Sequence, residues 1–237
     1  MTINKTLADL AVLREALEQK MEAETAKANL ARYFPPNIVD RLADRDQPLG
    51  AVRTQSVAVM FVDIVGFTHI AERQSPEEEV ATLRDFYARM EAAVFDNNGT
   101  LDKFLGDGIM ATFGAALTTD SYAADSLRAA EALLEAQDSW NQERAGAGEP
   151  AIAVGVGVAV GSVVFGAVGD DSRLEYTVIG DAVNLAAKLE RHTKVEPARA
   201  LTTAATLVGP LLELVTVPGP SGQAGAAVAH HALGMPA

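Results

Sequence analysis

Two short apolar runs around a tight turn constrain the fold of this chain more than any other feature. Thr100–Phe104 and Ile109–Phe113 flank the letters LGDG, which is typical of a β-hairpin. A hairpin joins antiparallel strands, whereas the rest of the chain alternates between strand and helix patterns. Together these patterns predict a mixed sheet with helices packed on it, in the α/β or α+β class.

The other elements follow from the spacing of apolar residues and from helix-capping signals. Strands are predicted at residues 56–62 and 175–179, and one or two strands are predicted within the Val- and Gly-dense segment 151–169, with weak strand signals at 211–217 and 226–233. Helices are predicted at 121–140 and 180–192, and another begins at Ser75, followed by Pro76 and, at the third helical position, Glu78. The glycines of 151–169 indicate that another backbone segment comes close to this strand region.

Residues 5–31 are rich in helix-forming residues and contain no Gly or Pro. Leu10, Leu13, Leu17 and Met21 form one apolar stripe, and two prolines at 35 and 36 end the helix. The pattern is compatible with an amphipathic helix packed on its own domain and with a stalk that forms a dimer. We therefore expect a helical stalk and linker at 1–48 and a larger domain at 49–237.

Charge and composition exclude several classes of partner. The net charge of −13 argues against general affinity for nucleic acids or anionic lipids. The absence of cysteine excludes disulfides and thiolate metal sites, which fits a reducing compartment. No apolar run reaches the ~20 residues that span a bilayer. We expect a soluble cytoplasmic protein, or the soluble part of a longer signalling protein.

Asp63 follows one predicted strand and Asp107 lies between two others, a pattern that suits the binding of metal ions. Asp63 ends the apolar run VAVMFVD, and the turn after it contains Gly66 before a helix start, where free N–H groups attract phosphate. Asp107 lies in the LGDG turn. Each has a structural alternative, as a helix cap or as a turn residue. As a pair, they suit two divalent ions, and oxygen-only ligation favours Mg²⁺ or Mn²⁺.

A third motif, EYTVIGDAVNLAAKLE, places Asn184 and Lys188 four residues apart on a predicted helix. This spacing puts the amide and the ammonium on one helix face. The two groups side by side can hold a ribose and a phosphate. The alternative is a solvated helix face without a ligand.

The segments FVDIVGFT, KFLGDGIMATFG and YTVIGDAVNLAAKLE, in this order and spacing, resemble the catalytic domain of the class III nucleotidyl cyclases over about residues 50–205. The segment ARYFPPNIVDRL is similar to the joint between stalk and catalytic domain in bacterial members. The resemblance implies a mainly antiparallel sheet of the ferredoxin-like, palm type. It also implies a homodimer with two sites across the interface, in which the 3′-hydroxyl of ATP attacks the α-phosphorus to give cyclic AMP and pyrophosphate.

The resemblance assigns roles to residues of both subunits. It implies two Mg²⁺ or Mn²⁺ ions per site, held by Asp63, Asp107 and the backbone of Ile64, with the β- and γ-phosphates along Gly66, Phe67 and Thr68. The partner subunit would supply Lys103 and Thr177 to the base, Asn184 to the ribose and Lys188 to the phosphate charge.

Hydrogen bonding favours adenine at this site. Adenine accepts at N1 and donates from its 6-amino group, which suits a Lys103 donor and a Thr177 acceptor. Guanine would need an acid at 103, where guanylate enzymes of the family carry Glu, so guanylate cyclase activity is the less favoured prediction. Thr177 also resembles the subgroup that is linked to bicarbonate stimulation, which makes bicarbonate an expected partner.

Two departures from the family pattern lower the phosphate-binding capacity. Lys188 stands where the family usually has Arg, which holds two phosphate oxygens in a planar fork. The region VPGPSGQAGAAVAHHAL lacks the Lys that commonly contacts the terminal phosphates, leaving only His230 and His231. The alternative to an enzyme is therefore a degenerate or regulatory cyclase-like module that dimerises and binds nucleotide with little turnover.

Overall fold

A computed structural model describes residues 13–25, 39, 52–116, 118–170, 173–196 and 198–207. The chain divides into two units, Met1–Gly50 and Ala51–Ala237. In the first unit residues 13–25 are helical, and the apolar side chains of Leu13, Leu17 and Met21 are exposed. The rest of the predicted helix at 5–31, the predicted strands at 211–217 and 226–233, and both C-terminal histidines lie outside the described residues. The predicted stalk and its boundary at 48 stay predictions.

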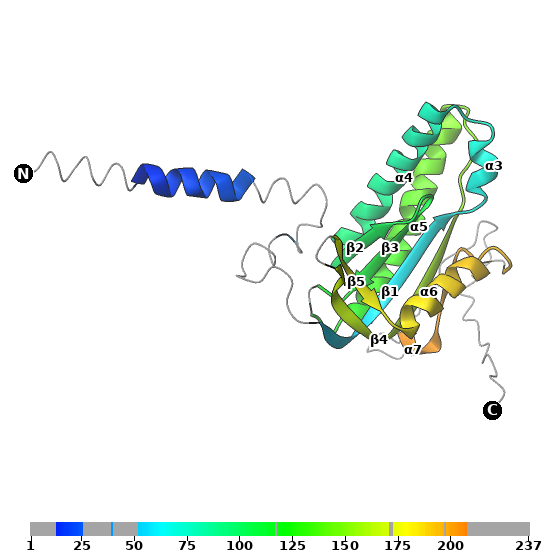
Figure 1. The fold of residues 1–237 in the computed structure, drawn as a ribbon. Helices are drawn as coiled ribbons and strands as arrows, with labels where there is room; N and C mark the ends of the chain where they lie inside the picture. The colour runs from blue at the N-terminus through cyan, green and yellow to red at the C-terminus, as the bar shows by residue number, and fades with distance from the viewer. Residues whose placement is uncertain are drawn as a thin grey trace, which may run out of the picture. The chain divides into compact units, whose positions relative to one another are not determined.

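The second unit is built on one sheet of six strands, in the order β2-β3-β1-β4-β5 with β6 beside β4 (Figure 1). Only β6 runs parallel to its neighbour, so the sheet is mainly antiparallel, as predicted. The predicted hairpin is formed by β2 and β3. Most of the segment 151–169 lies in one long strand, β4, rather than in two. The strands are β1 Arg53–Ile64, β2 Gly99–Phe104, β3 Gly108–Phe113, β4 Val154–Asp170, β5 Arg173–Ile179 and β6 Ala200–Thr202.

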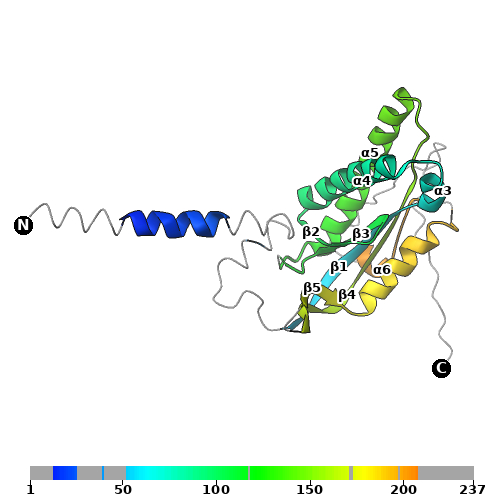
Figure 2. The same ribbon diagram turned by 45° about the horizontal axis from the view of Figure 1, so that its top comes forward.

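The long helices lie on both faces of this sheet, with α4 and α5 on one face and α6 on the other (Figure 2). The predicted capping box is present at the start of α4, where the Glu78 backbone N–H donates to Ser75 Oγ at 3.3 Å and the Ser75 N–H donates to Glu78 Oε2 at 2.7 Å. The helices are α3 Phe67–Ala71, α4 Pro76–Asp96, α5 Tyr122–Gly146, α6 Asp181–His192 and α7 Ala204–Leu207.

The main core lies between the sheet and the α4/α5 layer. Alternate residues of β1, from Ala58 to Ile64, point into it, because successive side chains of a strand face opposite sides. Phe86 and Met90 of α4 and Leu133 of α5 meet them and are fully buried. This alternation leaves Asp63 on the other face, beneath α6.

Helix α6 contacts β4 through glycines, as the sequence predicted for this strand. A Cβ atom at Gly157 would lie 2.2 Å from Ala186 O and 2.2 Å from Glu190 N, so any side chain there would collide with the helix backbone. At Gly155 it would lie 2.2 Å from Thr193 Oγ1. These two positions fix how closely α6, which carries the third motif, approaches the sheet.

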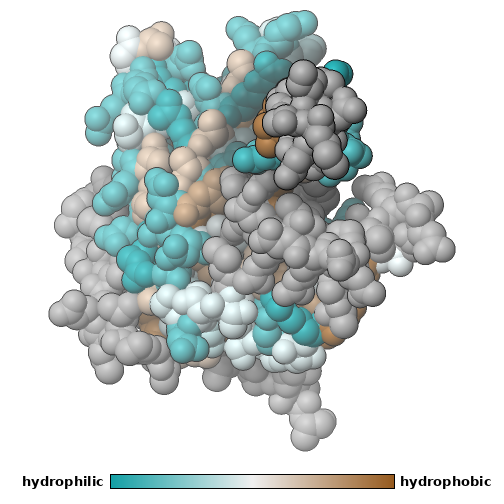
Figure 3. Space-filling view, turned by 90° about the vertical axis from the view of Figure 1, so that its left-hand side faces the viewer, coloured by the Kyte–Doolittle hydropathy of each residue, from teal (hydrophilic) through white to brown (hydrophobic). Residues whose placement is uncertain are grey.

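One face of the molecule shows how polar and apolar residues are distributed on the surface. On the face that lies at the left of Figure 1, the coloured surface is mostly hydrophilic, with a narrow paler and brown strip between the teal areas (Figure 3). Among the described residues, no helix combines the length and the apolar character needed to cross a membrane.

Candidate active site

The structure brings Asp63 and Asp107 together at one edge of the sheet. Asp63 pairs in register with Gly108 of β3 and Gly155 of β4, and the backbone N–H of Ile64 donates to Asp107 O at 3.1 Å. A Cβ atom on Gly108 would lie 2.9 Å from Asp63 Oδ1, so the carboxylate lies directly over that glycine. Burial raises the pKa of Asp63, and the nearby negative charge of Asp107 raises it further.

The turn that carries Asp107 is held in place by α4. Gly106 adopts a left-handed φ of 72°, and the backbone N–H of Leu105 donates to Gly108 O at 2.8 Å. The Tyr87 hydroxyl donates to Gly106 O, and its ring contacts the Phe104 ring at a centroid distance of 4.4 Å. These contacts fix the turn and therefore the place of Asp107.

A cation already lies beside Asp63. Lys194 Nζ is 2.6 Å from Asp63 Oδ2 and 3.2 Å from Glu190 Oε1. Burial raises the pKa of Glu190, whereas the Lys194 ammonium opposes the rise in the pKa values of both carboxyl groups. Burial lowers the pKa of Lys194, but its hydrogen bond to Asp63 and the negative charges of Asp63 and Glu190 together outweigh this, so the net shift is upward. Lys194 is not among the residues predicted from the sequence, because only its spacing from Glu190 is a local signal.

The chemistry of this site suits a hard divalent cation. The acids offer only oxygen ligands, and the Lys194 ammonium shows that a positive charge fits beside Asp63. Within the described part of the chain, no three His, Asp or Glu side chains gather into a metal-binding cluster. An ion here would therefore depend on two carboxylates, a backbone carbonyl such as that of Ile64, and oxygens of a substrate or water.

The turn after β1 presents backbone N–H groups next to the acids. Gly66 has a left-handed φ of 71° and precedes the five-residue helix α3. Phe67 is buried and anchors the turn, while Thr68 is exposed. The first N–H groups of a helix have no acceptor within it, so they are available to an anion. A helix this short sums few peptide dipoles, so the N–H groups matter more than the dipole that the sequence suggested.

Lys103 and Thr177 also come together, although they lie on β2 and β5. The Thr177 hydroxyl donates to Asp102 Oδ1 at 2.9 Å, and Lys103 Nζ lies 3.6 Å from that same oxygen. Lys103 Nζ also donates to Glu175 Oε2 at 2.9 Å. The register of β2 shifts between Leu101 and Lys103, which turns the Asp102 side chain towards β5.

Asp102 is a second residue that the sequence analysis missed. Its side chain is only 4% exposed, and burial raises its pKa against the opposing effects of the Thr177 hydrogen bond and the Lys103 charge. Burial lowers the pKa of Lys103, but its hydrogen bond to Glu175 and the charge of Asp102 raise it overall. No local pattern marks Asp102, because a bulge and a strand 75 residues away create its environment.

Asn184 and Lys188 lie on the exposed side of α6, as their spacing predicted, opposite Ala182 and Ala186, which face the sheet. Among the described residues, no hydrogen bond or ion pair joins either of them to Asp63 or Asp107. One chain therefore presents three separate sets of predicted site residues. They are the acids with the Gly66 turn, the Lys103–Thr177 cluster and the exposed face of α6.

Known proteins are similar to this chain in both sequence and fold. Residues 49–206 match the family model of the adenylate and guanylate cyclase catalytic domain. An adenylate cyclase of Anabaena cylindrica is 37% identical over 170 residues, covering 69% of this chain and 33% of that protein. Adenylate cyclase 1 of Rhizobium meliloti is 32% identical over 193 residues, covering 81% of this chain and 29% of that protein. The chain thus spans about a third of the length of these relatives.

Solved structures with both base specificities resemble the fold. The guanylyl cyclase Cya2 aligns with a TM-score of 0.61 and 28% identity, covering 67% of this chain and 79% of that chain. The adenylyl cyclase CyaB from P. aeruginosa aligns with a TM-score of 0.59 and 28% identity, covering 67% of this chain and 81% of that chain. The family-model match and the adenylate cyclase relatives show that this chain belongs to the class III nucleotidyl cyclases, through their adenylate and guanylate cyclase catalytic domain.

Proposed function

We propose that this protein is an adenylate cyclase, which converts ATP into 3′,5′-cyclic AMP and pyrophosphate. The observation that carries the proposal is the pair of acids, Asp63 and Asp107, that the hairpin and β1 place side by side next to the N–H groups after Gly66. In the reaction the 3′-oxygen forms a bond to the α-phosphorus, the bond from that phosphorus to the bridging oxygen breaks, and the hydroxyl proton is released.

Two Mg²⁺ or Mn²⁺ ions would be held by Asp63, Asp107 and the carbonyl of Ile64. When bound, such ions stabilise the attacking and the leaving oxygen. The N–H groups of Gly66, Phe67 and Thr68 would bind the β- and γ-phosphate oxygens and orient the leaving group. These residues lie together in one chain, which supports treating them as one half of a site.

The choice of ATP depends on the Lys103–Thr177 cluster, because similar structures include both adenylyl and guanylyl cyclases. Lys103 would donate to adenine N1, and the Thr177 oxygen would accept from the 6-amino group. Guanine presents a donor at N1 and an acceptor at O6, so it would meet a donor with a donor at the first position. The expected link between Thr177 and bicarbonate stimulation stays a prediction.

The second half of each site would come from another copy of the chain. Asn184 and Lys188 share an exposed helix face without a contact to the acids of their own chain, which supports a homodimer. Asn184 would orient the ribose, and Lys188 would stabilise negative charge that develops at the α-phosphate. The exposed stripe of Leu13, Leu17 and Met21 is a further candidate contact between the two copies.

The direct test is incubation of the purified protein with ATP or GTP in the presence of Mg²⁺ or Mn²⁺, with measurement of cyclic nucleotide and pyrophosphate. ATP should be the better substrate. Asp63→Asn should abolish turnover and leave the circular dichroism spectrum unchanged. Near-normal cyclic AMP production by that variant would show that Asp63 has no role in the reaction.

A mixing experiment tests the shared site. Asp63→Asn and Asn184→Ala are each expected to be inactive, because each loses one half of every site in a homodimer. A mixture of the two should regain activity, since a heterodimer keeps one intact site. Failure to regain activity, with subunit exchange verified by labelled chains, would contradict the shared-site arrangement.

A degenerate module that binds ATP is the second candidate, and Lys188 is the observation that favours it. An ammonium replaces the guanidinium that the family usually provides, and loss of one transition-state donor costs roughly 10²–10³ in rate. Calorimetry that detects ATP binding, together with an absence of cyclic AMP and pyrophosphate, would support this candidate instead.

A further inference from the structure

We propose that Asp102 is a positioning residue that sets the preference for adenine, by fixing the Thr177 hydroxyl as a hydrogen-bond acceptor towards the base. The inference deepens the proposed function and rests on it, because it concerns how the same base-reading cluster distinguishes ATP from GTP. Asp102 itself would not touch the nucleotide, since its side chain is 4% exposed.

The Thr177 hydroxyl donates its only hydrogen to the Asp102 carboxylate. A hydroxyl has one donor and two acceptor positions, whereas an ionised carboxylate only accepts. With Thr177 Oγ1 at 2.9 Å from Asp102 Oδ1, the hydrogen points at the carboxylate. The Lys103 ammonium at 3.6 Å favours the ionised form of Asp102. What Thr177 can offer on its other side is therefore lone pairs alone.

A Thr177 oxygen that can only accept a hydrogen bond distinguishes the 6-substituents of adenine and guanine. The amino group of adenine donates to it, whereas the O6 atom of guanine is itself an acceptor and is repelled. A Thr177 hydroxyl without Asp102 would be free to rotate and would donate to O6 as readily as it accepts from an amino group. The carboxylate therefore converts an ambiguous side chain into a selective one.

Replacement of Asp102 should change the selectivity for ATP over GTP mainly by altering Thr177 rather than Lys103. Lys103 has a closer partner in Glu175, whose Oε2 lies 2.9 Å from Nζ, so the ammonium stays anchored when Asp102 is replaced. Thr177 is 8% exposed, and Asp102 is the acceptor of its hydroxyl hydrogen. Removal of the carboxylate thus changes the hydrogen bonding of the hydroxyl first.

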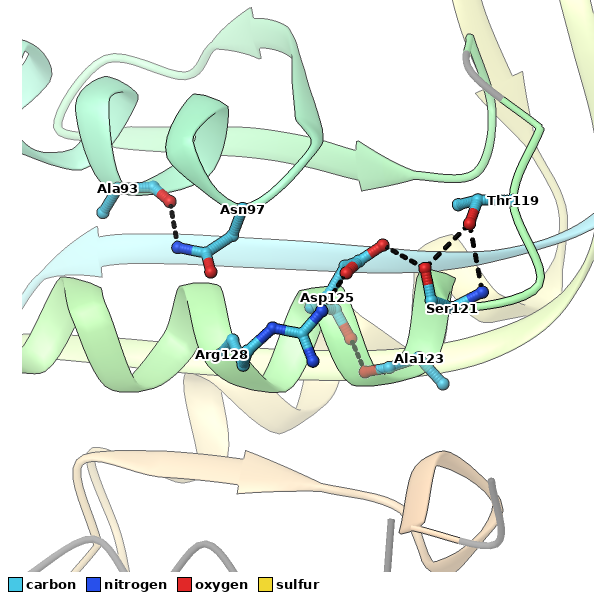
Figure 4. A network of polar contacts seen from close by, with 8 residues as sticks. Ala93, Asn97, Thr119, Ser121, Ala123, Asp125 and Arg128 are labelled. Atoms are coloured by element: carbon cyan, nitrogen blue, oxygen red, sulfur yellow. Dashed lines mark hydrogen bonds and ion pairs between the residues drawn. The ribbon is translucent and has the colours of Figure 1, made fainter. Parts of the chain in front are cut away.

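A purely structural role is the alternative, and the chain provides a matched control. Asp125 on α5 is also a buried carboxylate, 1% exposed, that accepts from a hydroxyl, Ser121 Oγ at 2.7 Å, and pairs with a cation, Arg128 (Figure 4). It belongs to a different network, away from the base-reading cluster. Asp125→Leu should lower the melting temperature but leave base selectivity unchanged.

The experiment measures selectivity, defined as kcat/KM for ATP divided by kcat/KM for GTP, in a double-mutant cycle of the full chain. Asp102→Leu should lower selectivity about tenfold, which is the size expected for one hydrogen bond to a neutral group. Thr177→Val should also lower it. Adding Asp102→Leu to Thr177→Val should change selectivity by less than about twofold, because no hydroxyl remains to be oriented.

Several outcomes would overturn the proposal. Selectivity of Asp102→Leu within twofold of wild type would do so, as would equal losses from Asp102→Leu in the Thr177 and Thr177→Val backgrounds, or an equal loss in Asp125→Leu. If Asp102→Leu does not fold, Asp102→Ala replaces it. If its turnover is too slow, the ratio of dissociation constants for 3′-deoxy-ATP and 3′-deoxy-GTP gives the same comparison. A wild-type protein without any cyclase activity would instead contradict the proposed function.

Discussion

Replacement of Lys194 should strengthen the binding of divalent ions at Asp63. The ammonium nitrogen lies 2.6 Å from Asp63 Oδ2, so a metal ion must displace it before it can use that oxygen. Lys194→Met keeps an unbranched side chain that is one atom shorter and removes the competing charge. Metal binding to the variant should then no longer include the cost of breaking this ion pair.

The size of the effect follows from the exposure of the pair. A hydrogen bond between charged groups contributes about 1.5–3 kcal/mol when it is well buried. The Asp63 side chain is 23% exposed and that of Lys194 is 35% exposed, so solvent screening lowers this figure to about 1–2 kcal/mol. That free energy corresponds to an increase in metal affinity of about 5- to 30-fold.

The measurement is titration of the protein with Mn²⁺, with free Mn²⁺ followed by electron paramagnetic resonance, in the presence and absence of 3′-deoxy-ATP. Arg191→Met is the matched control, because it removes one positive charge from the last turn of α6, close to Lys194 in sequence, where the Arg191 side chain donates to Ala187 O at 3.2 Å. If Lys194→Met binds Mn²⁺ no more tightly than wild type or Arg191→Met, the ammonium does not compete with metal and the reasoning fails.

Three other predictions test separate features. Gly157→Ala should lower the free energy of unfolding by about 2 kcal/mol or more in urea unfolding, because its Cβ would collide with the backbone of α6, whereas Gly146→Ala, with open space around it, should not destabilise. Burial raises the pKa of Glu91 in the folded protein. The wild type should therefore lose stability relative to Glu91→Gln as the pH rises from the unfolded-state pKa of about 4.5 through the raised folded value. Unfolding curves at several pH values test the direction of this change. Lys188→Arg should raise kcat more than it changes KM, and an equal kcat for wild type and Lys188→Ala would place this residue on a solvated helix face without a catalytic role.

Local signals explain what the sequence predicted well. The cap of α4 depends on residues within one turn, so Ser75 and Glu78 identified it directly. The hairpin likewise follows from its own turn, and the glycines of β4 indicated a close backbone approach that α6 provides. The predicted pairing of Asp63 with Asp107 needed only the strand order around that hairpin.

Contacts between distant segments explain what the sequence did not predict. β1 begins at Arg53, earlier than expected, because its polar first residues are held by pairing with β4 rather than by an apolar pattern. The contact of Lys194 with Asp63 spans 131 residues, and that of Asp102 with Thr177 spans 75. Neither has a local pattern. The catalytic roles of the predicted residues depend on a ligand and a second subunit, so they stay predictions.

The close packing of α6 on the glycines of β4 has a mechanical consequence. Contacts between two backbones contain no rotamers that can adjust, so strand and helix should move as one rigid body. Lys194 follows the C-terminal end of this helix, and Asn184 lies near its N-terminal end. In the proposed homodimer these ends serve different sites. Any movement of this rigid body in one subunit would therefore displace residues of both sites at once, so α6 would couple the two sites mechanically.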